Sequence, residues 1–543
     1  MTTIDDVIFN ENTKQMAIRG NETMENSYKQ EKPFLNKTFT YIEDNNGNSD
    51  YGTNQCKFSL KNMAANGRWN DLKNSVLAIP KIAIFKRTGR TQTIDKTLRF
   101  NDASKYLTYK SGSWNDIHSF KLDYGNNNII QQRENINAYI NYKHMNQNSG
   151  NDVDLNSGLD GFYKNSNEWT FKAEEGLCNT NNTLGYEFSF NNYDATKSPI
   201  ITQDNFNNSG ANYYKYETVG VVNADLALDS FKGEHVFYTT SYIRLKDLPF
   251  LENMIMTQGA DIEITIWFNQ SETIVTYVAG AKTAFVNNLR GSSNILHRIN
   301  ETVVNNDYSD TMSWKVGSHK SYIDNTKLYE HQLKRCRLYI PSYILHPLFD
   351  EKYLSIGTKK IVFDDIIVHS IMDIKTGSFN YTITDSVANV KRLVIVPMLN
   401  KVSNGIQAVS SQESLFCSSP CTCVPCTIDN FNVKVASIPL YPECSNYKFE
   451  TFLNEMDGQE GVYANKVSGM SSGLINKVDY ESGVYGYITV DLSRKSELDY
   501  DKGFSLSIQG LLKSPATLDF LCYVVVKREC MINLADGSIR EIR

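Results

Sequence analysis

One short motif in the sequence matches the nucleophile turn of a hydrolase. Gly469-Met-Ser-Ser-Gly473 places Ser471 at the nucleophile position. In an α/β-hydrolase the base histidine follows this serine along the chain, within a pattern of alternating strands and helices. The last of the eight histidines is His369, and no such pattern surrounds the motif. We therefore interpret residues 469–473 as a Ser/Gly turn.

Four cysteines lie close together, at Cys417, Cys421, Cys423 and Cys426. Four thiolates can hold a tetrahedral zinc ion, but Cys421 and Cys423 are too close in sequence for the usual pair of Cys-x2-Cys knuckles. A disulfide and free thiols on an exposed loop are the alternatives, and the sequence leaves all three open. Any of them would stabilise a loop rather than catalyse, because four cysteine ligands leave no open coordination position.

Two pairs of adjacent carboxylates, Asp364-Asp365 and Glu174-Glu175, could in principle serve acid–base chemistry at a glycosidase site. Neighbouring residues of a strand face opposite sides, however, so neither pair should converge on one substrate. The basic groups at Lys334-Arg335-x-Arg337 and Lys359-Lys360 are typical of solvated surface or of strand-edge protection. The sequence predicts no catalytic, cofactor-binding or metal-binding residue, and no enzyme.

Composition and charge narrow the class of protein. The 543 residues include 55 Lys plus Arg against 61 Asp plus Glu, a net charge of −6 that argues against strong, sequence-independent nucleic-acid binding. The acidic start of the chain does not suggest a signal peptide, and the apolar stretches at 77–85 and 393–399 are far shorter than the roughly 20 residues of a membrane span. Ten cysteines scattered through so long a chain favour the reduced state.

Most of the secondary-structure elements that the sequence predicts, and that would position any functional site, are β-strands. They are short, β-branched and aromatic, and Asn/Gly/Ser-rich runs separate them, whereas long helical stripes are scarce. The clearest are Cys56–Leu60, Val76–Phe85, Ile262–Phe268, Lys360–Val368 and Phe520–Val526. The pattern predicts an all-β protein with long loops.

The two halves of the chain indicate a duplication. At an offset near 280 residues, Cys56-x-Phe-x-Leu60 matches Cys336-x-Leu-x-Ile340. At an offset near 245, Tyr242–Leu245 before one strand matches Thr489–Leu492 before another. We expect two large β-domains with longer insertions in the first, each with about eight strands as in a jelly roll.

Several segments also resemble the double jelly-roll major capsid proteins of Polinton-like viruses, virophages and related small tailless DNA viruses. The resemblance covers about residues 50–543. It is carried by Asn54–Phe58, Ala78–Pro80, Asn115–Ser119, Cys336–Pro341, Tyr353–Ile366, Phe431–Val435, Tyr447–Phe452, Ser472–Ile475, Val490–Arg494 and Val525–Ile532. The cysteine cluster departs from the family pattern.

The resemblance implies two tandem eight-stranded jelly rolls with long loop insertions. We expect an extended N-terminal arm at 1–50, the first jelly roll at 51–285, a connecting segment at 286–324 and the second jelly roll at 325–543. Loops at about 145–225 and 285–325 would form an exposed tower, and the arm would tie neighbouring units at the base.

The implied function is assembly of an icosahedral virion shell. The chain would form a homotrimer, a capsomer with pseudo-hexameric shape, that contacts neighbouring capsomers together with penton and minor capsid proteins. The sequence leaves open whether an internal membrane lies beneath the shell. The alternative is a β-sandwich lectin, spike or receptor-binding protein, in which the Tyr- and Asn-rich loops would bind a glycan or receptor.

Overall fold

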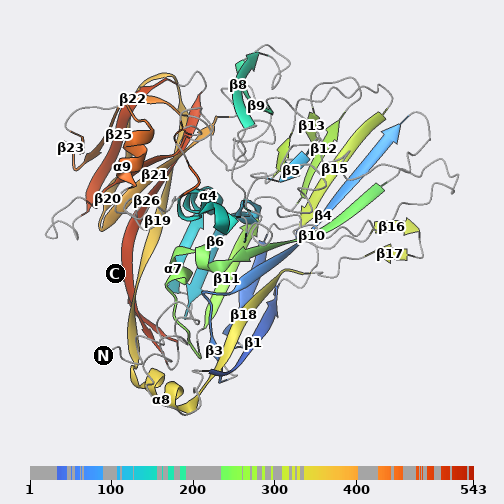
Figure 1. Cartoon of the computed structure of the whole chain (residues 1–543), viewed down its shortest axis with the longest axis vertical. Coiled ribbons are helices and arrows are strands. Elements are labelled where there is room, and N and C mark those ends of the chain that lie inside the picture. The colour runs from blue at the N-terminus through green and yellow to red at the C-terminus, as the bar shows by residue number, and fades with distance from the viewer. Residues whose placement is uncertain are drawn as a thin grey trace.

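The structure is a computed structural model of the whole chain, shown in Figure 1. It describes residues 34–45, 51, 55–61, 63, 67–89, 107–109, 113–125, 128–153, 155, 162, 169–175, 184–190, 234–259, 261–268, 272–277, 284–287, 295–297, 308–316, 321–324, 327–329, 335–400, 426–441, 446–456, 473–475, 477, 480, 486–493, 503–513, 517–534 and 537–542.

The first half of the chain forms a two-sheet jelly roll. Its eight framework strands are β1 (Phe34–Glu43), β2 (Gln55–Ser59), β4 (Val76–Gly89), β6 (Ile117–Tyr124), β7 (Asn128–Glu134), β10 (Glu234–Arg244), β11 (Ile262–Phe268) and β18 (Arg337–Leu345). One sheet has the order β1-β18-β4-β10, and the other has the order β2-β11-β6-β7. Counted along the chain, the strands therefore lie in the order 1-8-3-6 in one sheet and 2-7-4-5 in the other, and all of these pairs are antiparallel.

The second half repeats this arrangement. Its framework strands are β19 (Thr358–Ile374), β20 (Gly377–Val387), β21 (Val390–Leu399), β22 (Ile428–Val435), β23 (Ile438–Pro439), β24 (Ile488–Asp491), β25 (Phe504–Leu512) and β26 (Leu518–Asn533). The sheets are β19-β26-β21-β24 and β20-β25-β22-β23, which are again 1-8-3-6 and 2-7-4-5. The all-β prediction of two tandem eight-stranded jelly rolls is confirmed.

Additional elements decorate the two rolls. The strands are β3 (Trp69–Asn70), β5 (Leu107–Tyr109), β8 (Trp169–Glu175), β9 (Leu184–Phe190), β12 (Glu272–Tyr277), β13 (Ala284–Asn287), β14 (Ile295–His297), β15 (Tyr308–Val316), β16 (Ser321–Asp324), β17 (Lys327–Tyr329) and β27 (Ile539–Ile542). The helices are η2 (Ser113–Asp116), α4 (Ile136–Gln147), η4 (Leu245–Asp247), α7 (Pro249–Glu252), α8 (Pro347–Ser355) and α9 (Phe449–Glu455). Most extra strands belong to the first half, as the predicted insertions require.

The strand order corrects one of the two predicted repeats. The match at an offset near 245 aligns equivalent strands. Each of its segments lies at the end of the sixth strand of a roll, Tyr242–Leu245 at the end of β10 and Thr489–Leu492 at the end of β24. Cys56 lies on β2, the second strand, whereas Cys336 directly precedes β18, the eighth strand. The match at an offset near 280 is therefore wrong, because it aligns a second strand with an eighth. Alternation of apolar and polar residues shows that one face of a strand is buried, but it does not show which position the strand takes in the sheet.

The predicted domain limits stay a prediction, but the strand pairing bears on them. The paired framework strands of the first roll run from 34 to 345, and those of the second from 358 to 533. β1 lies inside the predicted arm 1–50 and pairs along its length with β18, which lies inside the range predicted for the second roll. The predicted tower loops at 145–225 and 285–325 fall in good part outside the described residues.

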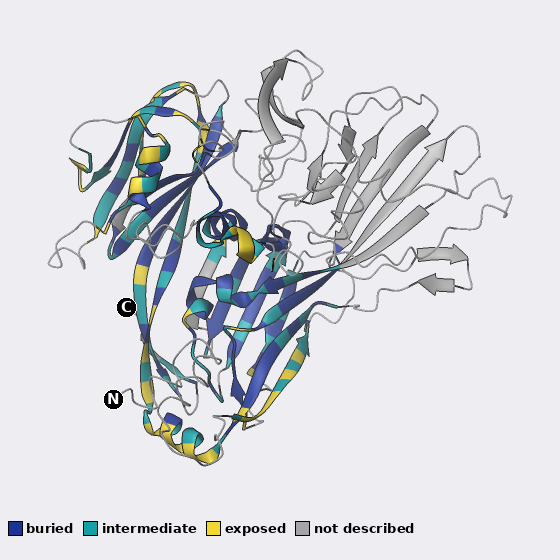
Figure 2. Ribbon diagram, viewed as in Figure 1, coloured by how far each residue is buried: buried dark blue, intermediate teal, exposed yellow. Residues whose placement is uncertain are grey.

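Buried residues line the framework strands of both rolls, as the colours of Figure 2 show for the described residues. On β18, Leu338 and Ile340 are buried between the sheets of the first roll. In the second roll, the ring of Phe379 on β20 meets the ring of Phe520 on β26, with ring centroids 5.9 Å apart. Gly510 lies below this ring, since a Cβ atom there would stand 2.6 Å from Ile428 and 3.0 Å from Phe379. The core therefore packs closely enough to require glycine at this position.

Candidate functional site

The two jelly rolls meet at a buried junction, which we take as the candidate functional site. In Figure 1, α4 lies between the sheet of β6 and β11 and the second roll, with α7 beside β19. Buried residues of both rolls form one continuous hydrophobic cluster, which includes Tyr142 and Phe250 from the first half and Phe363 and Tyr487 from the second. The described parts of the two rolls thus share a core.

Helix α4 is the central element of this junction. It follows β7 directly and begins after Asn135, whose left-handed backbone (φ 50°) turns the chain from the strand into the helix. It ends where the N–H of Asn148 donates to the carbonyl of His144. Nearly every residue between is buried, including Asn137 and Asn141. A helix buried on all sides needs partners for its polar groups, and both amides donate to the side-chain oxygen of Asn115.

Two tyrosines of α4 contact the second roll. The hydroxyl of Tyr142 and that of Thr489 on β24 are hydrogen-bonded at 2.6 Å, and the Tyr142 ring meets Tyr487 edge-on. The ring of Tyr139 lies 5.5 Å from that of Tyr523 on β26, whose hydroxyl donates to the carbonyl of Asn135 at 2.7 Å. Burial raises the pKa of Tyr523 well above its usual value. These rings combine apolar contact with satisfied polar tips.

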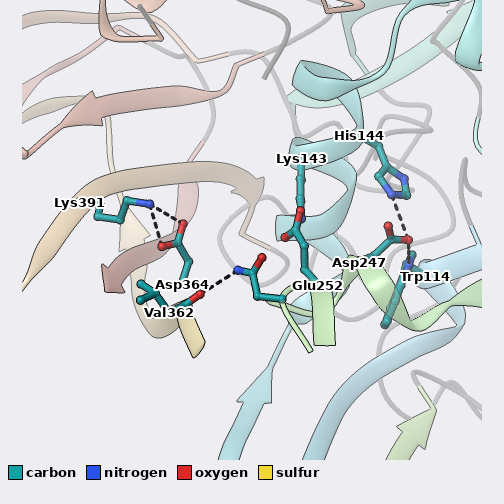
Figure 3. Close-up of polar contacts among 9 residues, drawn as sticks. Trp114, Lys143, His144, Asp247, Glu252, Val362, Asp364 and Lys391 are labelled. Carbon is teal, nitrogen blue, oxygen red and sulfur yellow. Dashed lines mark hydrogen bonds and ion pairs between the residues drawn. The ribbon is translucent and has the colours of Figure 1, made fainter. Parts of the chain in front are cut away.

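The other side of α4 is fixed to the first roll by charged groups, drawn in Figure 3. Nε2 of His144 lies 3.2 Å from a carboxylate oxygen of Asp247, and Nε1 of Trp114 donates to the same oxygen at 2.8 Å. Lys143 reaches Glu252 on α7 at 2.5 Å. Burial alone would raise the pKa of Asp247, but the charges and hydrogen bonds of His144, Lys143 and Trp114 lower it below its usual value.

An ion-pair cluster joins the edge strands of the two rolls. Asp365 on β19 is fully buried, and its carboxylate accepts from Arg133 on β7 through two guanidinium nitrogens, one of them Nε at 3.1 Å. Arg528 on β26 lies 3.1 Å from the same carboxylate. A buried carboxylate with two arginines is well compensated, and removing one partner would leave an uncompensated charge. Beside it, Asn253 donates to the carbonyl of Val362 at 3.0 Å (Figure 3).

The adjacent carboxylates of β19 diverge, as the alternation of a strand predicts. Asp364 binds Lys391 at 2.8 and 2.9 Å, whereas Asp365 binds the two arginines of the junction. The pair therefore does not converge on one substrate. The side chains of Glu174-Glu175 on β8 and the position of Ser471 lie outside the described residues.

The predicted basic groups have acidic partners where they are described. Arg337 donates to Glu43 at 2.8 and 3.1 Å, and Arg335 lies 3.9 Å from the same carboxylate. Lys360 pairs with Glu529 at 2.5 Å. These ion pairs hold β1 on β18 and β19 on β26, so the described basic residues stabilise pairs of neighbouring strands. Lys334 lies outside the described residues.

Of the cysteine cluster, the structure describes Cys426 alone, as a free thiol whose pKa is raised by burial. Cys417, Cys421 and Cys423 lie outside the described residues, and the state of the cluster stays open. Within the described ranges, no three His, Cys, Asp or Glu side chains gather into a metal-binding group. No helix in the described part of the chain is long and apolar enough to cross a membrane.

Comparisons with known proteins give likenesses in structure only. No protein-family model matches the sequence, and no curated protein matches it. A chain in the cryo-electron-microscopy structure of the Sputnik virophage is 11% identical, with a TM-score of 0.50, over 96% of this chain and 90% of that one. The major capsid protein of Faustovirus is 11% identical with a TM-score of 0.44, over 97% of both chains. A chain of the PBCV-1 virus capsid is 9% identical with a TM-score of 0.40, over 96% of this chain and 99% of that one.

The likeness to the Sputnik virophage chain extends over nearly the whole of both proteins. At such low identity it concerns the fold alone. The chain has a double jelly-roll fold.

Proposed function

We propose that this chain is a major capsid protein, which forms homotrimers that tile an icosahedral virion shell. The observation that carries the proposal is the pairing of two jelly rolls of identical strand order across a buried junction. Three such chains around an axis present six similar rolls, and a six-sided unit packs in a hexagonal layer. The function is then structural, with no catalytic step, and the protein is located in the virion.

The fold supports this proposal through its likeness to a chain from the Sputnik virophage particle. The junction between the rolls also supports the capsid proposal, because a unit that tiles a shell must keep its two rolls at a fixed angle. Tyr142, Asp365 and Phe363 each contact the opposite roll, so hinge motion between the rolls would expose apolar surface and separate buried charges.

The charge of the chain supports the partners that we propose. A net charge of −6 gives little attraction for a nucleic-acid backbone, so another protein or an internal membrane would face the genome. Neighbouring capsomers, penton proteins and minor capsid proteins would be the direct partners. We place the first roll at about 34–345 and the second at about 358–542.

Light scattering on the purified protein, with negative-stain images of the same peak, tests the proposal. A mass near three times 61.7 kDa, about 185 kDa, with hexagonal outlines is the expected result. A monomer in every condition would contradict the homotrimer, and a glycan array would then test the lectin alternative. Tight DNA binding at physiological salt would contradict the proposed partners.

A further inference from the structure

The core of the first roll holds two cysteines side by side. Cys56 lies on β2 and Cys336 directly precedes β18, so they come from the two opposite sheets of the roll. Both side chains are fully buried, and both are free thiols. The side chain of Cys56 forms a hydrogen bond with that of Cys336. The two residues lie 280 positions apart in the sequence, so only the fold brings them together.

The alternation of each strand directs both thiols into the same core. On β2, Cys56 and Phe58 are buried, whereas the residues beside them are half-buried. Cys336 precedes Leu338 and Ile340 at the same spacing of two, and these are buried between the sheets. Side chains two residues apart on a strand share a face. Both cysteines therefore point into the space between the two sheets.

Hydrogen bonds of the flanking backbone fix the two cysteines relative to each other. The N–H of Asp44 donates to the carbonyl of Cys336 at 3.1 Å, and its carboxylate accepts from the N–H of Lys57 at 2.6 Å. The N–H of Asn45 donates to the carbonyl of Lys57 at 2.9 Å. Cysteine side chains are short, so two that hydrogen-bond hold their Cα atoms close to the separation of about 4.4 to 6.8 Å that a disulfide spans.

A buried tyrosine packs beside the pair. The N–H of Cys336 donates to the hydroxyl of Tyr51 at 2.7 Å, and the Tyr51 ring meets that of Phe268 on β11 edge-on. Two cysteines from opposite sheets beside a buried aromatic ring match the setting of the inter-sheet disulfide in immunoglobulin domains. Burial raises the pKa of Cys56 well above its usual value, so little thiolate forms while the roll is closed. Oxidation should therefore be slow until the roll opens locally.

We propose that Cys56 and Cys336 form a disulfide when the protein meets an oxidising environment, and that this bond ties the two sheets of the first roll together. The inference goes beyond the proposed capsid function and does not depend on it. The oxidant is a low-molecular-weight disulfide such as oxidised glutathione.

The reaction proceeds by two exchange steps. One cysteine thiolate attacks a sulfur of oxidised glutathione, which forms a mixed disulfide and releases one glutathione thiolate. The second cysteine thiolate then attacks the protein sulfur of the mixed disulfide and releases the other glutathione. Two electrons and the two thiol protons pass from the protein to the two glutathione molecules.

The disulfide should stabilise the first roll strongly. It would close a loop of about 280 residues, which contains the strands of this roll from β3 to β17. A cross-link stabilises mainly by restricting the unfolded chain, and the effect grows with the length of the loop. We expect the oxidised protein to unfold at a temperature higher by roughly 5 to 15 °C than the reduced protein.

Peptide mapping of the full-length chain tests the bond directly. One sample is incubated with oxidised glutathione in urea below the unfolding transition, which lets the roll open transiently, and a second sample with reduced glutathione. Free thiols are alkylated before digestion with trypsin. The expected product of the oxidised sample is peptide 38–57 linked to the dipeptide Cys336-Arg337, and dithiothreitol should separate the two. Recovery of both cysteines only as alkylated thiols or glutathione adducts would overturn the proposal.

Substitutions test whether this pair causes the stabilisation. Cys56→Ala and Cys336→Ala should each abolish the difference in unfolding temperature between oxidised and reduced samples. Cys522→Ala is the matched control and should keep it, because Cys522 is equally buried but lies on the same strand as Cys530, about 26 Å away at 3.3 Å per residue.

Each variant is compared with its own reduced form, so a loss of core packing cancels. A difference that persists in both Cys56→Ala and Cys336→Ala would assign the effect to other cysteines and overturn the proposal. The mapped bond lies within one chain, so a protein that fails to form trimers would contradict the capsid function and leave this result unchanged.

Discussion

Asp365 should be the most sensitive charged residue of the junction, and Asp365→Asn tests this. The substitution keeps the shape of the side chain and removes the charge that Arg133 and Arg528 share. Breaking a buried ion pair costs about 3 to 5 kcal/mol. The arginine side chains are 19% and 39% exposed and can recover water, so we expect the lower end, about 3 kcal/mol. Unfolding temperature should fall by roughly 6 to 12 °C.

The neighbouring residue supplies the control for this prediction. Asp364 binds Lys391, but both side chains are about a quarter exposed, so Asp364→Asn should cost less than about 1 kcal/mol. Thermal unfolding followed by circular dichroism, at matched protein concentration, measures both variants. If the two unfold within about 1 °C of each other, or if Asp365→Asn is the more stable protein, the reasoning about the junction is refuted.

Three further predictions concern packing and pH. Gly510→Ala should destabilise the second roll by about 1 to 3 kcal/mol in thermal unfolding, because the new Cβ would meet Ile428 at 2.6 Å, whereas Gly150→Ala, with open space around it, should cause no loss. The lowered pKa of Asp247 contributes stability above about pH 4 that is lost as pH falls, so the gap in unfolding temperature between wild type and Asp247→Asn should narrow below that pH. The raised pKa of Tyr523 contributes stability below about pH 10 that is lost as pH rises, and Tyr523→Phe should therefore reduce the loss of stability above pH 10.

The strands of the framework were predictable because each buries one or both faces in a core. The predicted segment Ile262–Phe268 coincides with β11, and Lys360–Val368 and Phe520–Val526 lie within β19 and β26. Such segments carry their own signal, since β-branched and aromatic residues alternate or run continuously where a strand is buried. The ends of the strands were less predictable. For example, β19 continues beyond the predicted segment to Ile374, through residues that are mostly exposed or half-buried.

Helix α4 could not be found from the sequence, although it is the centre of the junction. A surface helix shows an apolar stripe against a polar one, but Ile136–Gln147 mixes Asn, Tyr and Ile around its whole circumference. The reason is that both rolls cover it, so Asn137 and Asn141 donate to Asn115 of the first roll while Tyr142 bonds to Thr489 of the second. The ion pair of Arg133 with Asp365 was missed for a related reason, because residues 232 positions apart carry no local pattern.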